Sequence, residues 1–183
     1  MKFWYIDVEI SGTRAFDEVI EVAIIEVTSD NSNCNWIFDS LIAGVDSITP
    51  SQESLTGISM NDLSQQGLPS IDLVVQHLLS IPKDTILVSY SLQFDLDFIC
   101  HTAELYGNEK LTGKGFQGIC LLNEVKALTG KHVSLDDALG IVRMNHRASV
   151  DAKLHFELHK RIRRRKRTNS SLFIANRTPS ILI

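Results

Sequence analysis

Three strand-like segments follow one another in the first 42 residues, and this order constrains the fold more than any other feature. Phe3–Val8, Val19–Thr28 and Cys34–Ile42 are rich in β-branched and aromatic residues, which favour strands. A Ser-Gly-Thr turn at residues 11–13 separates the first two, and Asn-Ser-Asn at residues 31–33 is the expected hairpin connection to the third. The chain is therefore expected to begin as a β-sheet.

The rest of the sequence alternates between helical and strand patterns. Helices are predicted around 71–79 and 96–106, between a short strand near 119 and Leu128, after Ser134, and from about 148 to 163, with another short strand at 85–89. Ser59 with Asp62 resembles a capping box, and Ser134 is expected to cap the helix that follows it. Three strands in a row followed by this alternation predict an α/β fold, with a mixed five-stranded sheet flanked by helices.

Composition places the chain among ordinary globular proteins. Its 183 residues are 44% hydrophobic and 22% charged, enough for one domain with a core that needs no disulfides. The three cysteines fit neither a zinc site nor a disulfide framework, so a cytoplasmic setting is expected. The sequence holds no apolar run of about 18 residues, and acids at positions 7 and 9 come too early for a signal peptide, so no membrane association is expected.

Charge is unevenly distributed along the chain. Residues 160–183 hold eight of the 18 Lys and Arg residues and none of the 22 acids, which leaves a net charge of −12 on residues 1–159. An acidic body can still bind nucleic acid if some of its carboxylates hold divalent cations, because the ions reverse the local field. The basic run Lys160–Arg167 is interpreted either as a contact for nucleic-acid phosphates or as a solvated helix end that complements the helix dipole.

A separate C-terminal tail, residues 164–183, is predicted after a body formed by residues 1–163. It begins with basic residues and contains two apolar segments, Ser171–Ile174 and Ile181–Ile183. These segments are expected either to pack on the body or to dock a partner, such as a polymerase or a repair protein, and the sequence leaves both open.

Two acids mark the end of the first strand. Asp7 and Glu9 are two residues apart, so their side chains point to the same face of the strand. Carboxylates held this close repel each other unless a cation lies between them. The alternative is that the strand ends at the surface and both acids are solvated, as most acids are.

Three further residues lie where a site would form. Asp95 follows the strand at 85–89 and begins a helix, although an acid near a helix N-terminus also has a purely structural explanation. His146 is predicted in a turn, and Asp151 falls in the first turn or so of the last helix. Each residue alone has an ordinary structural explanation, but their joint appearance in this order favours a functional site.

These segments together resemble a known enzyme family. Asp7–Gly12, Phe94–Asp95 and His146–Ala152 are similar to the three exonuclease motifs of the DEDDh family, which includes the epsilon proofreading subunit of bacterial DNA polymerase III, ribonuclease T and oligoribonuclease. Val19–Ala23 and Leu55–Ser59 also agree with that family, so the resemblance covers about residues 3–163. The His-Arg-Ala-x-x-Asp-Ala string is specific, whereas Asp-x-Glu alone would be weak.

The resemblance implies a ribonuclease H-like fold and a two-metal-ion 3′→5′ exonuclease that releases nucleoside 5′-monophosphates. The implied ligands of two Mg²⁺ or Mn²⁺ ions are Asp7, Glu9, Asp95 and Asp151. His146 is implied as the general base. The backbone at Ile10, Ser11 and Gly12 would meet the terminal nucleotide, with the Ile10 side chain as an apolar contact for its base.

Two departures from the family pattern concern substrate binding rather than chemistry. Tyr90–Ser91 stands where many relatives have His-Asn, and Ile10–Gly12 where many have Thr-Thr-Gly. The Thr-Gly-Ile segment at 56–58 and the Arg-Ala after His146 favour DNA 3′ ends, single-stranded or frayed, over RNA. The alternatives are an RNA exonuclease of the same family and a non-catalytic module that binds nucleic acid or docks on a polymerase.

Overall fold

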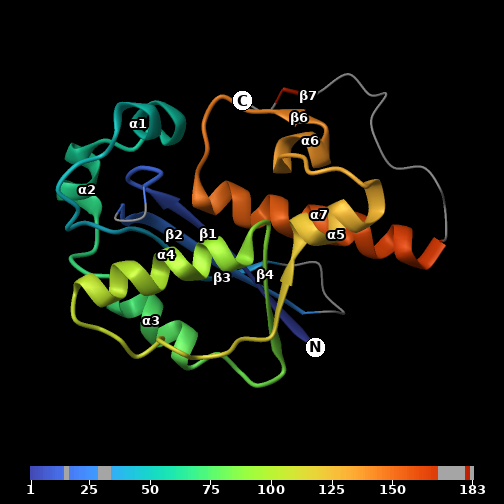
Figure 1. The fold of residues 1–183 in the computed structure, drawn as a ribbon, viewed down its shortest axis with the longest axis horizontal. Coiled ribbons are helices and arrows are strands. Elements are labelled where there is room, and N and C mark those ends of the chain that lie inside the picture. Colours follow the sequence, from blue (N-terminus) through green and yellow to red (C-terminus); the bar gives the residue numbers. More distant parts are fainter. Residues whose placement is uncertain (15–16, 29–33, 169–179, 182–183) are drawn as a thin grey trace.

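A mixed five-stranded sheet forms the centre of the computed structural model, which describes residues 1–14, 17–28, 34–168 and 180–181 (Figure 1). The strand order is β3-β2-β1-β4-β5. The strands are β1 (Lys2–Ile10), β2 (Val19–Thr28), β3 (Asn35–Leu41), β4 (Thr85–Ser89) and β5 (Gly118–Cys120). The α/β fold with a mixed five-stranded sheet, predicted from the order of elements, is confirmed.

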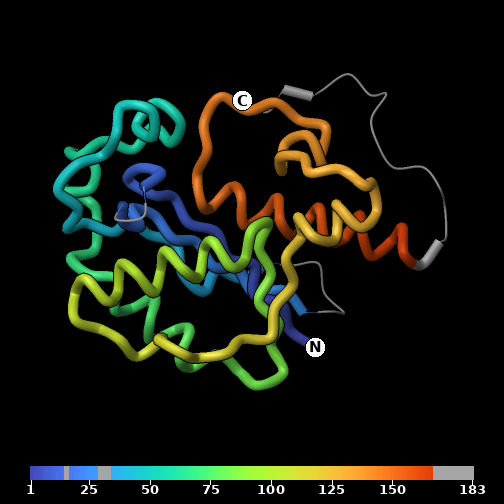
Figure 2. The backbone as a smooth tube through the Cα atoms, viewed as in Figure 1, coloured from blue at the N-terminus to red at the C-terminus, as the bar shows by residue number. Residues whose placement is uncertain are grey.

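Helices cover both faces of this sheet. They are α1 (Pro50–Thr56), α2 (Met60–Gln66), α3 (Asp72–Leu79), α4 (Leu92–Leu105), α5 (Leu121–Thr129), α6 (Leu135–Leu139) and α7 (Ala148–Thr168). Two short strands, β6 (Ile141–Val142) and β7 (Ser180–Ile181), pair in parallel away from the main sheet. Figure 2 traces the chain from the blue N-terminal strands to the orange and red helix α7, which packs against β1 and β2. No helix in the described part of the chain is long and apolar enough to cross a membrane.

Strand β1 continues beyond the end of its neighbour β4. It pairs in parallel with β4 only as far as Tyr5, opposite Val88, whereas its antiparallel pairing with β2 continues to Ile10. The last residues of β1 therefore lie past the carboxyl end of β4, and no strand among the described residues pairs with them on that side. In α/β sheets such a position is where binding sites form.

The two faces of β1 have different surroundings because side chains alternate along a strand. Trp4, Ile6 and Val8 belong to the core that includes α3 and α4. Phe3 and Tyr5 point the other way, into the core that includes α5 and α7. Asp7 and Glu9 are the next residues with this second orientation, so β1 presents two aromatic residues and then two acids toward α7.

Most predicted element boundaries agree with the structure. β2 has the predicted ends, and both predicted caps form: Ser59 and Asp62 hydrogen-bond reciprocally, and the Ser134 hydroxyl accepts from the Asp137 amide. The hairpin at residues 31–33 lies outside the described residues. Helix α7 continues to Thr168, so the predicted division at residue 163 falls inside a helix, and the division into body and tail stays a prediction.

The basic residues at the end of α7 contact the body of the protein. Arg161 donates to the Leu139 carbonyl at 2.9 Å, Arg163 lies over the Phe3 ring, and Lys166 pairs with Glu124. These contacts give part of the basic run a role in packing α7, and a contact with nucleic-acid phosphates stays a prediction. The apolar segment 171–174 lies outside the described residues.

Candidate active site

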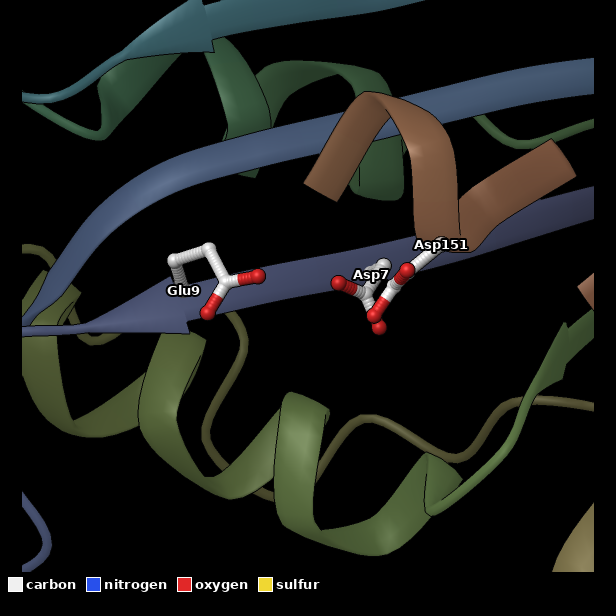
Figure 3. A group of neighbouring side chains, drawn as sticks. All are labelled: Asp7, Glu9 and Asp151. Carbon is white, nitrogen blue, oxygen red and sulfur yellow. The ribbon is translucent and has the colours of Figure 1, made fainter. Parts of the chain in front are cut away.

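Three acidic side chains meet where α7 crosses the end of β1. Asp7, Glu9 and Asp151 each offer one carboxylate oxygen, and these oxygens all lie within 4.8 Å of one another. Figure 3 shows Asp7 and Glu9 along β1 and the Asp151 carboxyl group reaching from α7 toward Asp7. Glu9 and Asp151 are only 8% and 7% exposed, so bulk water solvates these two carboxylates poorly. The predicted grouping of these three residues is therefore present in the structure.

Asp95 approaches the same place from α4. It lies in the first turn of that helix, is buried, and accepts a hydrogen bond from the Ser89 hydroxyl at the end of β4. It does not belong to the group of three carboxylates, but it lines the same cavity. Its predicted role as a metal ligand stays a prediction.

A cavity of about 380 Å³ opens over these carboxylates, within the usual size range of small-molecule pockets. Its lining includes all five residues predicted to be catalytic, namely Asp7, Glu9, Asp95, His146 and Asp151. The lining also includes Tyr90, Phe94, Asp136, Arg143 and His155, which are not among the predicted metal ligands and are not the predicted general base. The predicted catalytic residues thus share one cavity.

His146 lies beside the carboxylates in the loop before α7. Its Nδ1 is 3.5 Å from an Asp151 oxygen, its backbone amide donates to the Leu55 carbonyl, and its side chain is 31% exposed. Burial, and then the nearby Arg143 guanidinium, lower the pKa of His146 below its usual value. The imidazole is therefore neutral at pH 7 and able to accept a proton.

Arg143 is the cation that the structure itself places among the acids. Its side chain is 3% exposed and pairs with Asp151 and, at 2.5 Å, with Asp136, while Nη2 lies 3.3 Å from His146 Nδ1. The sequence contained no signal for this role, because a single arginine in a short strand-like segment is ordinarily solvated. Arg143 offsets part of the negative charge at the site.

Glu21 fixes the start of α7 and so positions Asp151. This β2 residue is 2% exposed, pairs with Arg147 at 2.6 Å and accepts the Ala148 amide at 2.8 Å. The amide is one of those that a helix start leaves without a partner inside the helix. An acid in the middle of the apolar run Val19–Thr28 was the sequence signal that could have identified this anchor.

Burial disfavours the charged forms of these carboxylates, so they keep their protons to higher pH than exposed acids do. Burial raises the pKa of Asp7 well above its usual range, with Asp95 and Glu9 adding to the effect. Burial, and then Glu21, raise the pKa of Glu9 to about 7, and burial raises that of Asp95 to about 8. A cluster of carboxylate oxygens whose ionisation is this unfavourable fits a divalent cation such as Mg²⁺ or Mn²⁺.

The predicted substrate-binding residues are the last residue of β1 and the first two residues after it, and they are not among the residues that line the cavity. The Ile10 side chain is 6% exposed within the core, so it is not available as an apolar contact for a base. The Ser11 hydroxyl accepts the Glu18 amide, and a Cβ on Gly12 would lie 2.3 Å from an Asp17 oxygen. Their side-chain positions are thus used by the fold, and a role for the backbone stays a prediction.

A protein-family model described as Exonuclease (RNase_T) matches residues 5–158, most of the chain. No curated protein sequence matches the chain significantly. The five residues predicted to be catalytic all fall within the matched range.

Solved exonuclease structures are similar to this fold at low sequence identity. E. coli exonuclease I in complex with a dT13 oligonucleotide gives a TM-score of 0.66 at 19% identity, covering 91% of this chain and 42% of that one. A 3′-exonuclease that recognises the 3′ end of a histone mRNA stem-loop gives a TM-score of 0.64 at 13% identity, covering 91% of this chain and 82% of that one. Exonuclease X in complex with 5′ overhanging duplex DNA gives 0.59 at 16%, covering 92% and 93%. The chain spans less than half the length of exonuclease I. The structural similarity to these exonucleases confirms the predicted ribonuclease H-like fold.

Replacing Glu21 tests whether it anchors α7. We expect Glu21→Ala to lower the free energy of unfolding by about 1–3 kcal/mol, because it leaves the buried Ala148 amide without an acceptor. Glu21→Gln retains an acceptor for the Ala148 amide, so its free energy of unfolding should fall by less. Urea denaturation of both variants measures this, and an unchanged stability of Glu21→Ala would show that α7 is held by its apolar contacts alone.

The raised carboxyl pKa values predict how stability depends on pH. Groups whose pKa is raised in the folded state stabilise it at low pH, and that contribution is lost as pH rises through pKa values of about 7 for Glu9 and about 8 for Asp95. Above about pH 6.5 the unfolded histidines are mostly neutral, so the acids dominate. We expect the Tm of metal-free protein to fall between about pH 6.5 and about pH 8.

The same experiment has two controls. Asp95→Asn should show a smaller fall, and Mg²⁺ should raise the Tm more at the higher pH, where more carboxylates are ionised. A Tm that is constant over this range, or an equal fall in Asp95→Asn, would contradict the electrostatic account.

Proposed function

The chain belongs to the exonuclease family, and from this premise we propose that it is a two-metal-ion 3′→5′ exonuclease. Its proposed substrates are single-stranded or frayed DNA 3′ ends, and its proposed products are nucleoside 5′-monophosphates. The observation that carries the proposal is the meeting of Asp7, Glu9 and Asp151 within 4.8 Å at the base of a cavity that also contains His146. Clustered carboxylates with a neighbouring neutral base are what metal-assisted hydrolysis of a phosphodiester requires.

The residues divide the work by position. Asp7, Glu9 and Asp151 would hold the divalent ions, with Asp95 completing the set from α4. When bound, the ions lower the pKa of the attacking water and stabilise negative charge on the leaving 3′ oxygen. His146, whose Nδ1 lies 3.5 Å from an Asp151 oxygen, would take the proton of that water. Arg143 limits the excess negative charge that an incoming phosphate would meet.

An exposed aromatic ring at the cavity, Phe94, supports a single-stranded substrate. Phe94 lines the cavity and is 46% exposed, and its ring centroid lies 4.7 Å from that of Phe98. Aromatic faces stack on unpaired bases without regard to sequence. A base that has left a duplex can reach such a surface, whereas a paired base cannot.

The choice of DNA over RNA rests on the segments around His146. The Leu55 carbonyl accepts the His146 amide, so the Thr-Gly-Ile segment that favours DNA-type relatives adjoins the proposed base. The similar structures of exonuclease I bound to dT13 and exonuclease X bound to duplex DNA support DNA as the substrate. RNA stays the alternative substrate, because two similar structures involve RNA: the 3′-exonuclease that recognises a histone mRNA stem-loop and the S. cerevisiae Pan2 module bound to AAGGAA RNA.

Degradation of matched oligonucleotides tests the proposal. With Mg²⁺ or Mn²⁺, the protein should shorten a 5′-labelled DNA strand from its 3′ end faster than an RNA of the same sequence, and excess EDTA should abolish activity. Asp7→Asn should lower the rate by several orders of magnitude while the protein stays folded, because a shared ligand is lost. Faster cleavage of the RNA would make RNA, not DNA, the proposed substrate. Full activity in EDTA would exclude the metal mechanism.

Replacing His146 tests the general base. We expect His146→Ala to lower kcat by about 10²–10⁴-fold, with binding of single-stranded DNA retained. The wild-type rate should rise with pH on the acid side as the imidazole loses its proton, and because the pKa of His146 is lowered, the midpoint should fall below about 6.5. An unchanged kcat in the variant would assign the base to another group of the cavity, and Tyr90 would then be replaced in turn.

A further inference from the structure

A second histidine, His155 on α7, lines the cavity beside the acidic cluster. It lies one helical turn after Asp151 on α7, so both side chains point to the same face of the helix. The side chain is 1% exposed, lines the cavity, and places Nε2 3.5 Å from Asp7 Oδ1. Within the described part of the chain, Nε2 has no hydrogen-bond partner. A buried polar atom without a partner is costly and calls for an explanation.

The backbone of β1 determines which nitrogen of His155 carries the proton. Nδ1 lies 3.1 Å from the Ile6 carbonyl oxygen, which can only accept, so Nδ1 must donate. The ring is 1% exposed, and a neutral imidazole with its proton on Nδ1 leaves a lone pair on Nε2. That lone pair faces the carboxyl group of Asp7. When Asp7 is ionised, the two facing groups are both acceptors, and a cation between them satisfies both.

We propose that Nε2 of His155 is a nitrogen ligand of the metal centre, shared with Asp7. The inference rests on the proposed function, because it concerns the same site. A histidine that binds a metal through one nitrogen typically donates its other N–H to a backbone carbonyl or a carboxylate, which fixes the tautomer and the ring. The Ile6 carbonyl already holds His155 in this arrangement.

A nitrogen ligand changes which ion the site prefers. Mg²⁺ binds oxygen ligands and keeps several waters, whereas imidazole suits transition metals better. With Asp7, Glu9 and Asp151 alone, Mg²⁺ and Mn²⁺ would be held by the same type of ligand. With His155 added, the centre favours Mn²⁺ and later divalent transition ions over Mg²⁺.

The structure offers matched variants for a test. His155→Asn keeps a side-chain N–H close to the position of Nδ1, so it can still donate to the Ile6 carbonyl, but it removes the group at Nε2. His159 is the control: it is also buried on α7 one turn further along, but its Nδ1 bonds to the Tyr5 hydroxyl, away from the acids. His146→Ala removes the other imidazole of the cavity.

Two measurements decide the proposal without using activity. Pulsed electron paramagnetic resonance of Mn²⁺ bound to the wild-type protein should show a nitrogen coupling, which persists in His146→Ala and His159→Asn and disappears in His155→Asn. Calorimetric titration with each ion should show that His155→Asn lowers the ratio of Mn²⁺ to Mg²⁺ affinity by about tenfold or more.

The outcomes separate this proposal from the proposed function. Mn²⁺ that binds to the wild-type protein without a nitrogen coupling overturns the role of His155 and leaves the carboxylate centre intact. A coupling that disappears only in His146→Ala assigns the nitrogen to His146 and also overturns it. If no divalent ion binds to the wild-type protein, both proposals fail. If His155→Asn does not fold, the wild-type and His146→Ala spectra together still decide, because His155 is the imidazole of the cavity lining that remains in His146→Ala.

Discussion

Mutual repulsion among buried carboxylates is the constraint on which the rest of the structure depends. One face of β1 changes from Phe3 and Tyr5 to Asp7 and Glu9, and it changes where the parallel neighbour β4 ends. Asp151 then brings a third acid to the same point from α7. Burial raises the pKa of each β1 acid, which means that the fold holds these groups at a cost unless a cation compensates them.

The surroundings of the cluster are built to hold it in place. Glu21 fixes the first turn of α7 through Arg147 and the Ala148 amide, and Arg143 supplies a buried positive charge beside Asp151. Further along α7, His155 and His159 bond to the β1 backbone at Ile6 and to the Tyr5 hydroxyl. Strand and helix are thus connected by polar contacts at successive turns, which keeps the acids in a fixed geometry and leaves the cavity above them open.

The sheet was predictable because strand patterns are local, whereas the grouping of Asp7, Glu9 and Asp151 was implied by the resemblance to the exonuclease motifs. Alternation in β1 was enough to place Asp7 and Glu9 on one face, and the motif around His146 placed Asp151 at a helix start. Arg143 and His155 were missed because their roles arise only when distant segments meet, and neither spacing nor residue type distinguishes them from solvated or core residues. Ile10 was expected at the substrate, but its side chain packs in the core because the strand continues to that residue.

The central claim is that this cluster is a metal centre, and anomalous scattering tests it most directly. Crystals of the wild-type protein grown with Mn²⁺ and a nucleoside 5′-monophosphate should show two anomalous peaks beside Asp7, with the phosphate of the nucleotide next to them. Crystals of Asp7→Asn grown in the same way should lose at least one of these peaks. An anomalous map of the wild-type protein without a peak among Asp7, Glu9 and Asp151, in crystals that contain the nucleotide, would contradict the account.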